Sequence, residues 1–416
     1  MLRNLKNALY FSVARYFKFF AHIRLARWNP RIVVVTGSNG KTTALHMMEV
    51  ELGNTARYSY GANSSFGIPF DILGLKRETY SPLEWISLTA KAPLQIWKKP
   101  PPEKIYVVEA DCDRPGEGEF LSSLLMPEVT VWLSSARTHS KNFDAVAHSG
   151  TFRSIDEAIA YEFGYFIERT SRLAIVNGDN AFISKQLYRT KAQVYEIKEQ
   201  AQLDAYSVGN GGSEFKVNGT IYRAPYLLPK ETFYALSAST KVAEYLGETP
   251  KNDLSTLTMP PGRSSVLKGI KGTTIVDSSY NVNAESVAAI LGMVERLSGT
   301  KWLILGDLTE QGAEEKEEHE RITRMIGPSE FQKIILVGPR LARYALPILK
   351  DAVSFDGPKD ALDYLLSSIE GGETLIFKGA RFLEGIIEHL LENKEDIAKL
   401  CRREEIWQKR RAQWGL

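Results

Sequence analysis

Residues 32–50, "IVVVTGSNGKTTALHMMEV", carry the clearest chemical signal of the chain. A β-branched run leads into a turn and then into a helical pattern, and the residues at this junction are Gly37, Ser38, Asn39, Gly40, Lys41, Thr42 and Thr43. Backbone N–H groups in such a turn, at a helix N-terminus, bind phosphate. The lysine would reach the β and γ phosphates, and the hydroxyl of Thr42 would complete a magnesium shell. The usual first glycine of this motif is Val35 here, but the strand before and the helix after still predict an ATP site with Mg²⁺.

Composition and charge place few limits on the partners. The chain has 416 residues, 44% of them hydrophobic, and a net charge of +2, which is typical of a globular protein and gives no argument for nucleic acid. Its two cysteines, Cys112 and Cys401, are too few for a disulfide framework and suit a reducing, cytoplasmic setting.

The elements that must position the loop follow an α/β pattern. From residue 31 to 261, strand-like runs alternate with helical segments, which predicts a mostly parallel sheet in a central ATP-binding domain. Asn218-Gly219 predicts a hairpin turn in "EFKVNGTIYRA". A second α/β series over 262–416 predicts a Rossmann-like domain. The last 25 residues, which are strongly charged, predict a single helix solvated on one face.

Residues 1–30 form a basic segment without a single acid, and they predict an amphipathic helix. Arg15 and Lys18 interrupt its apolar run, so it is neither a signal peptide nor a bilayer-spanning helix. Two interpretations remain open: the helix lies on an anionic membrane surface, or its apolar face packs on the following domain. The second is slightly favoured.

Several segments, in order along the chain, resemble the Mur ligase superfamily. They are "TGSNGKTT", "GANSSFGIPF", "YVVEADCDRPGE", "SSARTHSKNFD", "IVNGDN", "PPGR", "DSSYNVNAES", "LGDLTEQGAEEKEEH" and "FKGAR". The resemblance is strongest to the MurF type, the UDP-N-acetylmuramoyl-tripeptide–D-alanyl-D-alanine ligases. It covers roughly residues 31 to 395 and implies a monomeric enzyme that uses ATP and Mg²⁺.

The resemblance also assigns roles to particular residues. Glu109 and His139 would hold magnesium together with Thr42, and Arg263 would reach nucleotide phosphates from the C-terminal domain. Asp277 and Asn281 would belong to the nucleotide site. The resemblance implies a reaction in which a substrate carboxylate attacks ATP to give an acyl phosphate. That step brings anions together, so cations must neutralise them. The catalytic groups would then be Lys41, Glu109, His139 and Arg263. For Asp307, Glu310 and His319, binding of the amine substrate and a solvated structural role stay equally open.

The sequence departs from the family pattern in three places. Ala160 stands where the family carries a carbamylated lysine that binds magnesium, and Glu157 or Glu162 is a hypothetical substitute because a carboxylate offers similar oxygens. Ser278 replaces one aspartate of an Asp-Asp pair. The family's N-terminal UDP-binding domain is also expected to be absent.

The predicted function is ATP-dependent amide-bond formation through an acyl phosphate. The leading interpretation adds an amino acid or a dipeptide such as D-Ala-D-Ala to a cell-wall precursor peptide. One alternative keeps the chemistry with a different carboxylate, from pseudomurein, poly-γ-glutamate or a cofactor precursor. The other is a degenerate ATP-binding scaffold, since fold does not fix substrate.

Overall fold

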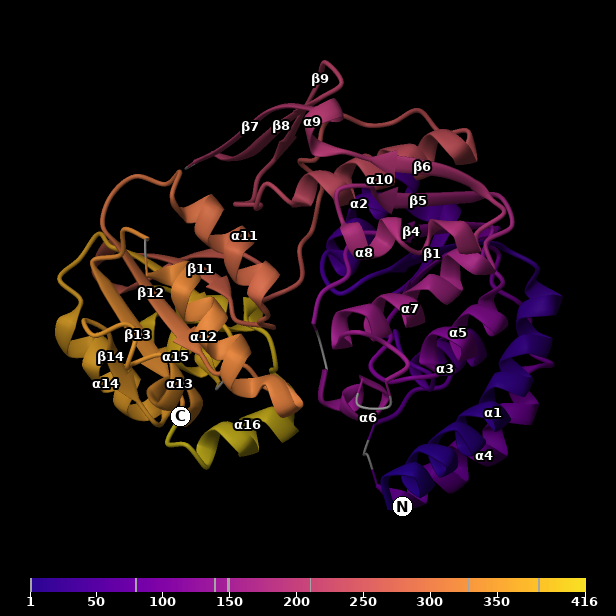
Figure 1. Cartoon of the computed structure of the whole chain (residues 1–416), viewed down its shortest axis with the longest axis horizontal. Helices are drawn as coiled ribbons and strands as arrows, with labels where there is room; N and C mark the ends of the chain where they lie inside the picture. The colour runs from indigo at the N-terminus through magenta and orange to yellow at the C-terminus, as the bar shows by residue number, and fades with distance from the viewer. Residues whose placement is uncertain are drawn as a thin grey trace. The chain divides into compact units, whose positions relative to one another are not determined.

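The computed structural model describes residues 2–78, 81–137, 140–147, 150–209, 211–327, 329–380 and 382–416. The chain divides into two compact units, which are drawn in Figure 1. The first comprises residues 1–202 and 233–251, and the second comprises residues 203–232 and 252–416. These units differ from the expected segments 31–261 and 262–416 in two stretches, because residues 203–232 and 252–261 group with the second unit.

The first unit is built around a six-stranded sheet in the order β2-β3-β1-β4-β5-β6, in which every pairing is parallel. Its strands are β1 (Arg31–Thr36), β2 (Ala56–Ser59), β3 (Ile105–Ala110), β4 (Val129–Trp132), β5 (Leu173–Asn177) and β6 (Gln193–Ile197). Its helices are α1 (Leu2–Trp28), α2 (Lys41–Leu52), α3 (Gly67–Leu73), α4 (Pro82–Gln95), α5 (Glu117–Leu125), α6 (Asp144–Ala147), α7 (Ile155–Glu168), α8 (Ala181–Ser184), α9 (Glu199–Gln202) and α10 (Thr232–Leu246).

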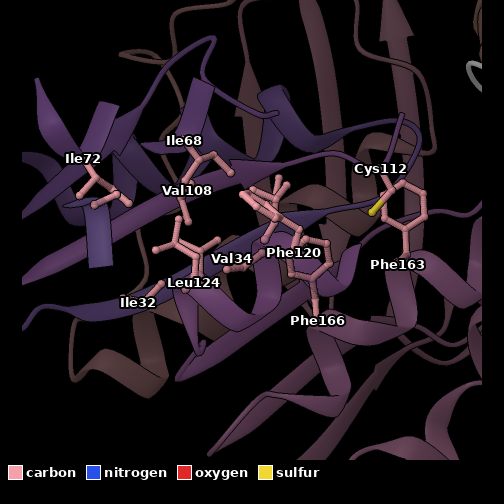
Figure 2. Packing of buried hydrophobic residues seen from close by; sticks show 14 of the residues in the cluster. Ile32, Val34, Ile68, Ile72, Val108, Cys112, Phe120, Leu124, Phe163 and Phe166 are labelled. Atoms are coloured by element: carbon pink, nitrogen blue, oxygen red, sulfur yellow. The ribbon is translucent and has the colours of Figure 1, made fainter. Parts of the chain in front are cut away.

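One face of this sheet carries a core made with α1, α3, α4, α5 and α7. Alternate residues of a strand point to the same face, so Ile32 and Val34 of β1 join this core together with Val108 of β3. Figure 2 shows these side chains against Phe120 of α5 and Phe166 of α7. The core therefore fixes the strand whose end carries the phosphate-binding loop.

Helix α1 confirms the interpretation that the basic segment packs on its own domain. Its buried stripe includes Phe17, Leu25 and Trp28, which belong to the core just described. The spacing of that stripe follows the helical repeat. Among the helices of the described residues, none has both the length and the apolarity that crossing a bilayer requires.

The second unit has a sheet in the order β10-β11-β15-β12-β13-β14, parallel except for the β10–β11 pair. Its strands are β10 (Ser265–Lys268), β11 (Thr274–Ser278), β12 (Lys301–Gly306), β13 (Lys333–Val337), β14 (Val353–Phe355) and β15 (Thr374–Lys378). Its helices are α11 (Ala284–Val294), α12 (Glu315–Ile326), α13 (Pro339–Tyr344), α14 (Pro358–Ser368), α15 (Leu383–Leu390) and α16 (Glu405–Ala412). Helices α11, α12 and α13 cover one face, and α14 and α15 cover the other.

A small antiparallel sheet of β7 (Leu203–Gly209), β8 (Gly212–Val217) and β9 (Thr220–Ala224) belongs to the same unit. Its β8–β9 turn confirms the predicted hairpin: Asn218 and Gly219 have φ values of 48° and 81°, which a two-residue turn between twisted strands requires.

The prediction of one helix at the C-terminal end is wrong. A 3₁₀ segment, Lys394–Lys399, is followed by a break and then by α16. At the break Leu400 and Cys401 are buried, and Arg402 has a φ of 56°. A helix cannot continue through a left-handed residue.

Candidate active site

The phosphate-binding loop lies between β1 and α2, as predicted. Gly37 has a φ of 122°, and a Cβ there would stand 2.7 Å from the carbonyl oxygen of Ser134. Gly40 has a φ of 84° and begins α2. Both glycines are therefore needed, because a side chain would clash at Gly37 and strain the backbone at Gly40. Glycine at these two positions thus lets the loop pass close to the main chain of Ser134 and turn into α2.

The loop is held in place by the segment that follows β4. The Ser38 hydroxyl donates to the carbonyl of Ala136 at 2.7 Å and accepts from its N–H at 2.9 Å. The N–H of Asn39 donates to the Ser134 hydroxyl at 2.7 Å. A loop fixed by its neighbours keeps its N–H groups oriented before a phosphate arrives, which lowers the entropy cost of binding.

Lys41 is buried and forms an ion pair with Asp111, with 2.8 Å between Nζ and Oδ2. Its Nζ also donates to the carbonyl of Gly37. Burial lowers the pKa of this ammonium, but the carboxylates of Asp111 and Glu109 outweigh burial and leave the pKa above its ordinary value. Lys41 is therefore held as a cation at the loop.

Thr42 and Glu109 meet as expected for a magnesium site. The Thr42 hydroxyl donates to Oε2 of Glu109 at 2.9 Å. The register of β1 and β3 explains the meeting, because Glu109 pairs with Val35 at the carboxyl end of the sheet, where the loop begins. A hydroxyl and a carboxylate are oxygen donors of the type that Mg²⁺ prefers, so these two residues fit the ion.

The other predicted metal ligand cannot be placed. His139 lies outside the described residues. Within the described ranges no group of three or more His, Cys, Asp or Glu side chains is arranged to hold a metal ion.

Helix α7 corrects the idea that Glu162 replaces the missing lysine. Ala160 is buried in the core of the first unit. Glu162 accepts the N–H groups of Gly116 at 2.8 Å and Gly118 at 3.0 Å, so its carboxylate caps the N-terminus of α5. Burial raises the pKa of Glu162 to about 7. Glu157 accepts a hydrogen bond from the N–H of Arg153 at 3.0 Å. Its role as a substitute for the lysine stays a prediction.

In the second unit Asp277 and Asn281 lie close in sequence to Tyr280, whose ring contacts Arg263. The Arg263 guanidinium lies 4.6 Å from the centre of the Tyr280 ring. Asp277 is buried at the end of β11, and burial raises its pKa. One of its oxygens accepts the N–H of Ser279 at 3.0 Å, and the other has no hydrogen-bond partner among the described residues. Asn281 uses its side-chain oxygen to accept the N–H of Val282 at 2.8 Å.

Lys378 is a buried residue of this region to which the sequence assigned no role. Its Nζ donates to the carbonyl of Asn281 at 2.9 Å. Burial, followed by the nearby charge of Arg263, lowers its pKa to about 7. The sequence could have pointed to Lys378, because it belongs to the "FKGAR" segment that resembles the family. Arg381 of that segment lies outside the described residues.

Asp307 and His319 are not solvated, which corrects one of the two interpretations left open for them. His319 is fully buried: its Nδ1 bonds the carbonyl of Glu315 at 2.6 Å, and its Nε2 accepts from the N–H of Leu308 at 3.3 Å. These bonds suit a neutral ring, and burial lowers the pKa of His319. Asp307 accepts the N–H of Leu341 at 3.0 Å. Both side chains hold the unit together from inside, whereas Glu310 is exposed.

Sequence reasoning also missed Asp111, the partner of Lys41. Its position could have revealed it: Asp111 follows Glu109 by two residues, and alternate residues at a strand end point to the same side.

Known proteins resemble this chain in sequence and in fold. Residues 262–381 match the family model described as the Mur ligase, glutamate ligase domain. A UDP-N-acetylmuramoyl-tripeptide–D-alanyl-D-alanine ligase of Bacillus subtilis is 26% identical over 380 residues, which is 87% of this chain and 76% of the relative. The protein of the same name from Escherichia coli is 24% identical, and the match covers 87% of this chain and 77% of that protein.

Solved structures show the same fold. The MurF ligase of Thermotoga maritima in complex with ADP superposes with a TM-score of 0.74 at 22% identity, over 95% of this chain and 84% of that one. MurF of Acinetobacter baumannii superposes with a TM-score of 0.75 at 20% identity, over 91% of this chain and 80% of that one. Residues 262–381 thus match the C-terminal domain of Mur ligases, and the chain as a whole resembles MurF-type ligases in sequence and fold.

Proposed function

We propose that the chain is an ATP-dependent ligase that joins a carboxylate to an amine and forms ADP and phosphate. The observation that carries this proposal is the pairing of Lys41 with Asp111 and of Thr42 with Glu109 at one end of the first sheet. The names of the relatives indicate the substrates: a cell-wall precursor peptide would supply the carboxylate, and D-alanyl-D-alanine would supply the amine.

In the proposed reaction, a carboxylate oxygen of the acceptor bonds to the γ-phosphorus as the bond to ADP breaks. The amine nitrogen then bonds to the acyl carbon, phosphate leaves, and the nitrogen loses a proton. The first step brings anions together, so the loop N–H groups and Lys41 would hold the phosphates and neutralise the charge that shifts toward ADP. Displacement of Asp111 from Lys41 by a phosphate would keep the ammonium paired throughout.

Magnesium would be held by Thr42 and Glu109, with His139 as a further proposed ligand. When bound, the ion would neutralise part of the negative charge of the phosphates. Glu109 also orients the Thr42 hydroxyl, which donates to its Oε2 at 2.9 Å.

Three residues of the second unit are candidates for nucleotide binding. We propose that Arg263 binds nucleotide phosphates and that Asp277 and Asn281 contribute to the same site. Support comes from the stacking of Arg263 on Tyr280, which holds the guanidinium plane in a fixed direction. We also propose that the chain acts as a monomer.

The test is the release of phosphate from ATP in the presence of Mg²⁺, UDP-N-acetylmuramoyl tripeptide and D-alanyl-D-alanine. Release that requires both substrates is expected. The Lys41→Ala variant should lose at least about a hundredfold in kcat, because a preorganised cation at developing charge is worth that much. Lys191→Ala is the matched control, since this exposed lysine of the same unit precedes β6, at the amino end of the parallel sheet, whereas the loop lies at the carboxyl end.

The two alternatives give different results. ATP binding without release on these substrates, but with release on another carboxylate, would contradict the proposed acceptor and keep the ligase chemistry. Binding without turnover on any carboxylate and amine would contradict the enzyme and favour a scaffold.

A further inference from the structure

Helix α4 exposes an apolar stripe along one side. Leu83, Ile86, Leu94 and Trp97 are 76%, 68%, 66% and 78% exposed, and Ala90 lies between them in the sequence. Positions 83, 86, 90 and 94 recur at helical spacing and therefore share a face of α4, and Trp97 follows two residues beyond the end of the helix. The opposite side of α4 is buried in the core of the first unit. Single exposed apolar residues are common, but a whole helix face marks an interaction surface.

A groove of about 820 Å³ continues this stripe toward α1. It is lined mostly by apolar and aromatic side chains, among them Tyr10, Val13, Tyr16, Phe66, Trp85 and Ile86. We call the exposed stripe of α4 and this groove the α1–α4 face.

The α1–α4 face is held rigidly. Pro93 lies inside α4 and has no N–H to donate to the carbonyl of Thr89, four residues earlier. The Tyr16 hydroxyl of α1 donates to that carbonyl instead, at 2.9 Å. Arg24 of α1 donates to the carbonyl of Gln95 at the end of α4. The face is therefore preformed.

Positive charge borders the α1–α4 face. Residues 1–30 contain six basic residues and no acid, and of these Arg15 and Arg27 are exposed. Arg27 lies 5.8 Å from the ring of Trp97, and the exposed Lys98 and Lys99 follow directly. Between residues 82 and 99 the only acid is Glu84, which lies 3.9 Å from Arg77.

We propose that the α1–α4 face binds the surface of an anionic lipid bilayer. A tryptophan beside leucine and isoleucine, bordered by arginine and lysine, matches the boundary between acyl chains and acidic headgroups. A second copy of the chain is a poorer occupant, because facing copies would bring these like charges together. The helices lie on the membrane and do not cross it. This inference does not depend on the proposed reaction.

The test is cosedimentation of the full chain with phosphatidylcholine vesicles that contain or lack phosphatidylglycerol. Binding is expected only with phosphatidylglycerol and should fall as salt is raised. The triple variant Ile86→Ser, Leu94→Ser, Trp97→Ser should lower the partition coefficient at least about tenfold, as should Lys98→Glu with Lys99→Glu. Circular dichroism confirms that each variant is folded. Tyr188→Ser is the matched control, because Tyr188 is an apolar residue of the same unit that is 79% exposed.

Three outcomes would overturn the proposal. One is no binding of the wild type to phosphatidylglycerol vesicles. Another is equal binding of the folded triple variant and the wild type. The third is a dimer, seen by sedimentation equilibrium, that dissociates in the triple variant, since a second copy would then cover the face.

Discussion

The buried ion pair of Lys41 and Asp111 joins the start of α2 to the end of β3, and its two side chains are only 7% and 13% exposed. Removing one partner leaves a charge buried without compensation. We expect Asp111→Ala to lower the free energy of unfolding by about 3 kcal/mol in the absence of nucleotide. The Lys41→Ala, Asp111→Ala double variant should lose less than the two single variants together, with a coupling of about 1–3 kcal/mol. Urea unfolding of all four proteins measures this, and additive losses would contradict the pairing.

Glu162 gives the first unit a pH dependence of stability. Its pKa is raised from 4.5 to about 7 by burial, so the folded state binds the proton more tightly than the unfolded state. The stabilisation is complete below pH 4.5 and is lost as the pH rises through 7. Glutamine stays neutral at every pH. The unfolding free energy of Glu162→Gln minus that of the wild type should therefore rise by about 2–3 kcal/mol from pH 5 to pH 8.

Urea unfolding at pH 5 and pH 8 measures that difference. The matched control is Glu248→Gln, which changes an exposed glutamate of the same unit. The same stability difference at both pH values would show that Glu162 titrates normally.

At the scale of elements, one hydrogen bond between α1 and α4 arises because Pro93 leaves the carbonyl of Thr89 without its helical donor and the Tyr16 hydroxyl takes that place. Tyr16→Phe removes the donor to the Thr89 carbonyl and should cost about 0.5–1 kcal/mol in unfolding free energy. In a Pro93→Ala background the helix regains its own N–H donor, so Tyr16→Phe should then cost less. Thermal unfolding of the four proteins decides this, and an equal cost in both backgrounds would contradict the explanation.

The elements that lead to the phosphate site could be predicted because their signals are local. Strand β1 is a continuous aliphatic run that ends in a glycine-rich turn, and β3 has the same character before Glu109. Strands β2 and β6 are hard to predict from sequence because each is short and mixes polar with apolar residues. The C-terminal helix was predicted from charge spacing, which says nothing of the burial of Leu400 and Cys401 that interrupts it.

The residues of the candidate site could likewise be predicted only where their signals are local in sequence. Lys41 and Thr42 follow from the loop itself, and Glu109 follows from its strand and the family resemblance. The partnership of Asp111 with Lys41 depends on a strand seventy positions away in sequence, and the low pKa of Lys378 depends on burial. The capping of α5 by Glu162 likewise arises from packing between helices, which periodicity does not reveal.

At the scale of the whole molecule, two compact units predict two unfolding transitions in calorimetry. Phe17 is fully buried in the first unit, where its ring centre lies 4.8 Å from that of Phe70. Phe17→Ala should cost about 3–5 kcal/mol and lower one Tm by roughly 10 °C. Phe377→Ala, in the core of the second unit, should lower the other. A shift of both transitions by either variant would contradict separate units.

The chain leaves the first unit after residue 202 and returns to it at residue 233 with α10. Helix α10 is tied there by Tyr234, which donates to Asp179 at 2.7 Å, and by Tyr245, which donates to Glu128 at 2.8 Å. During synthesis the ribosome must therefore deliver the three strands β7 to β9 before the first unit can close. A nascent chain that pauses within that hairpin sheet would present an unfinished nucleotide-binding unit to chaperones, so translation speed across residues 203–232 sets how long that vulnerable state lasts.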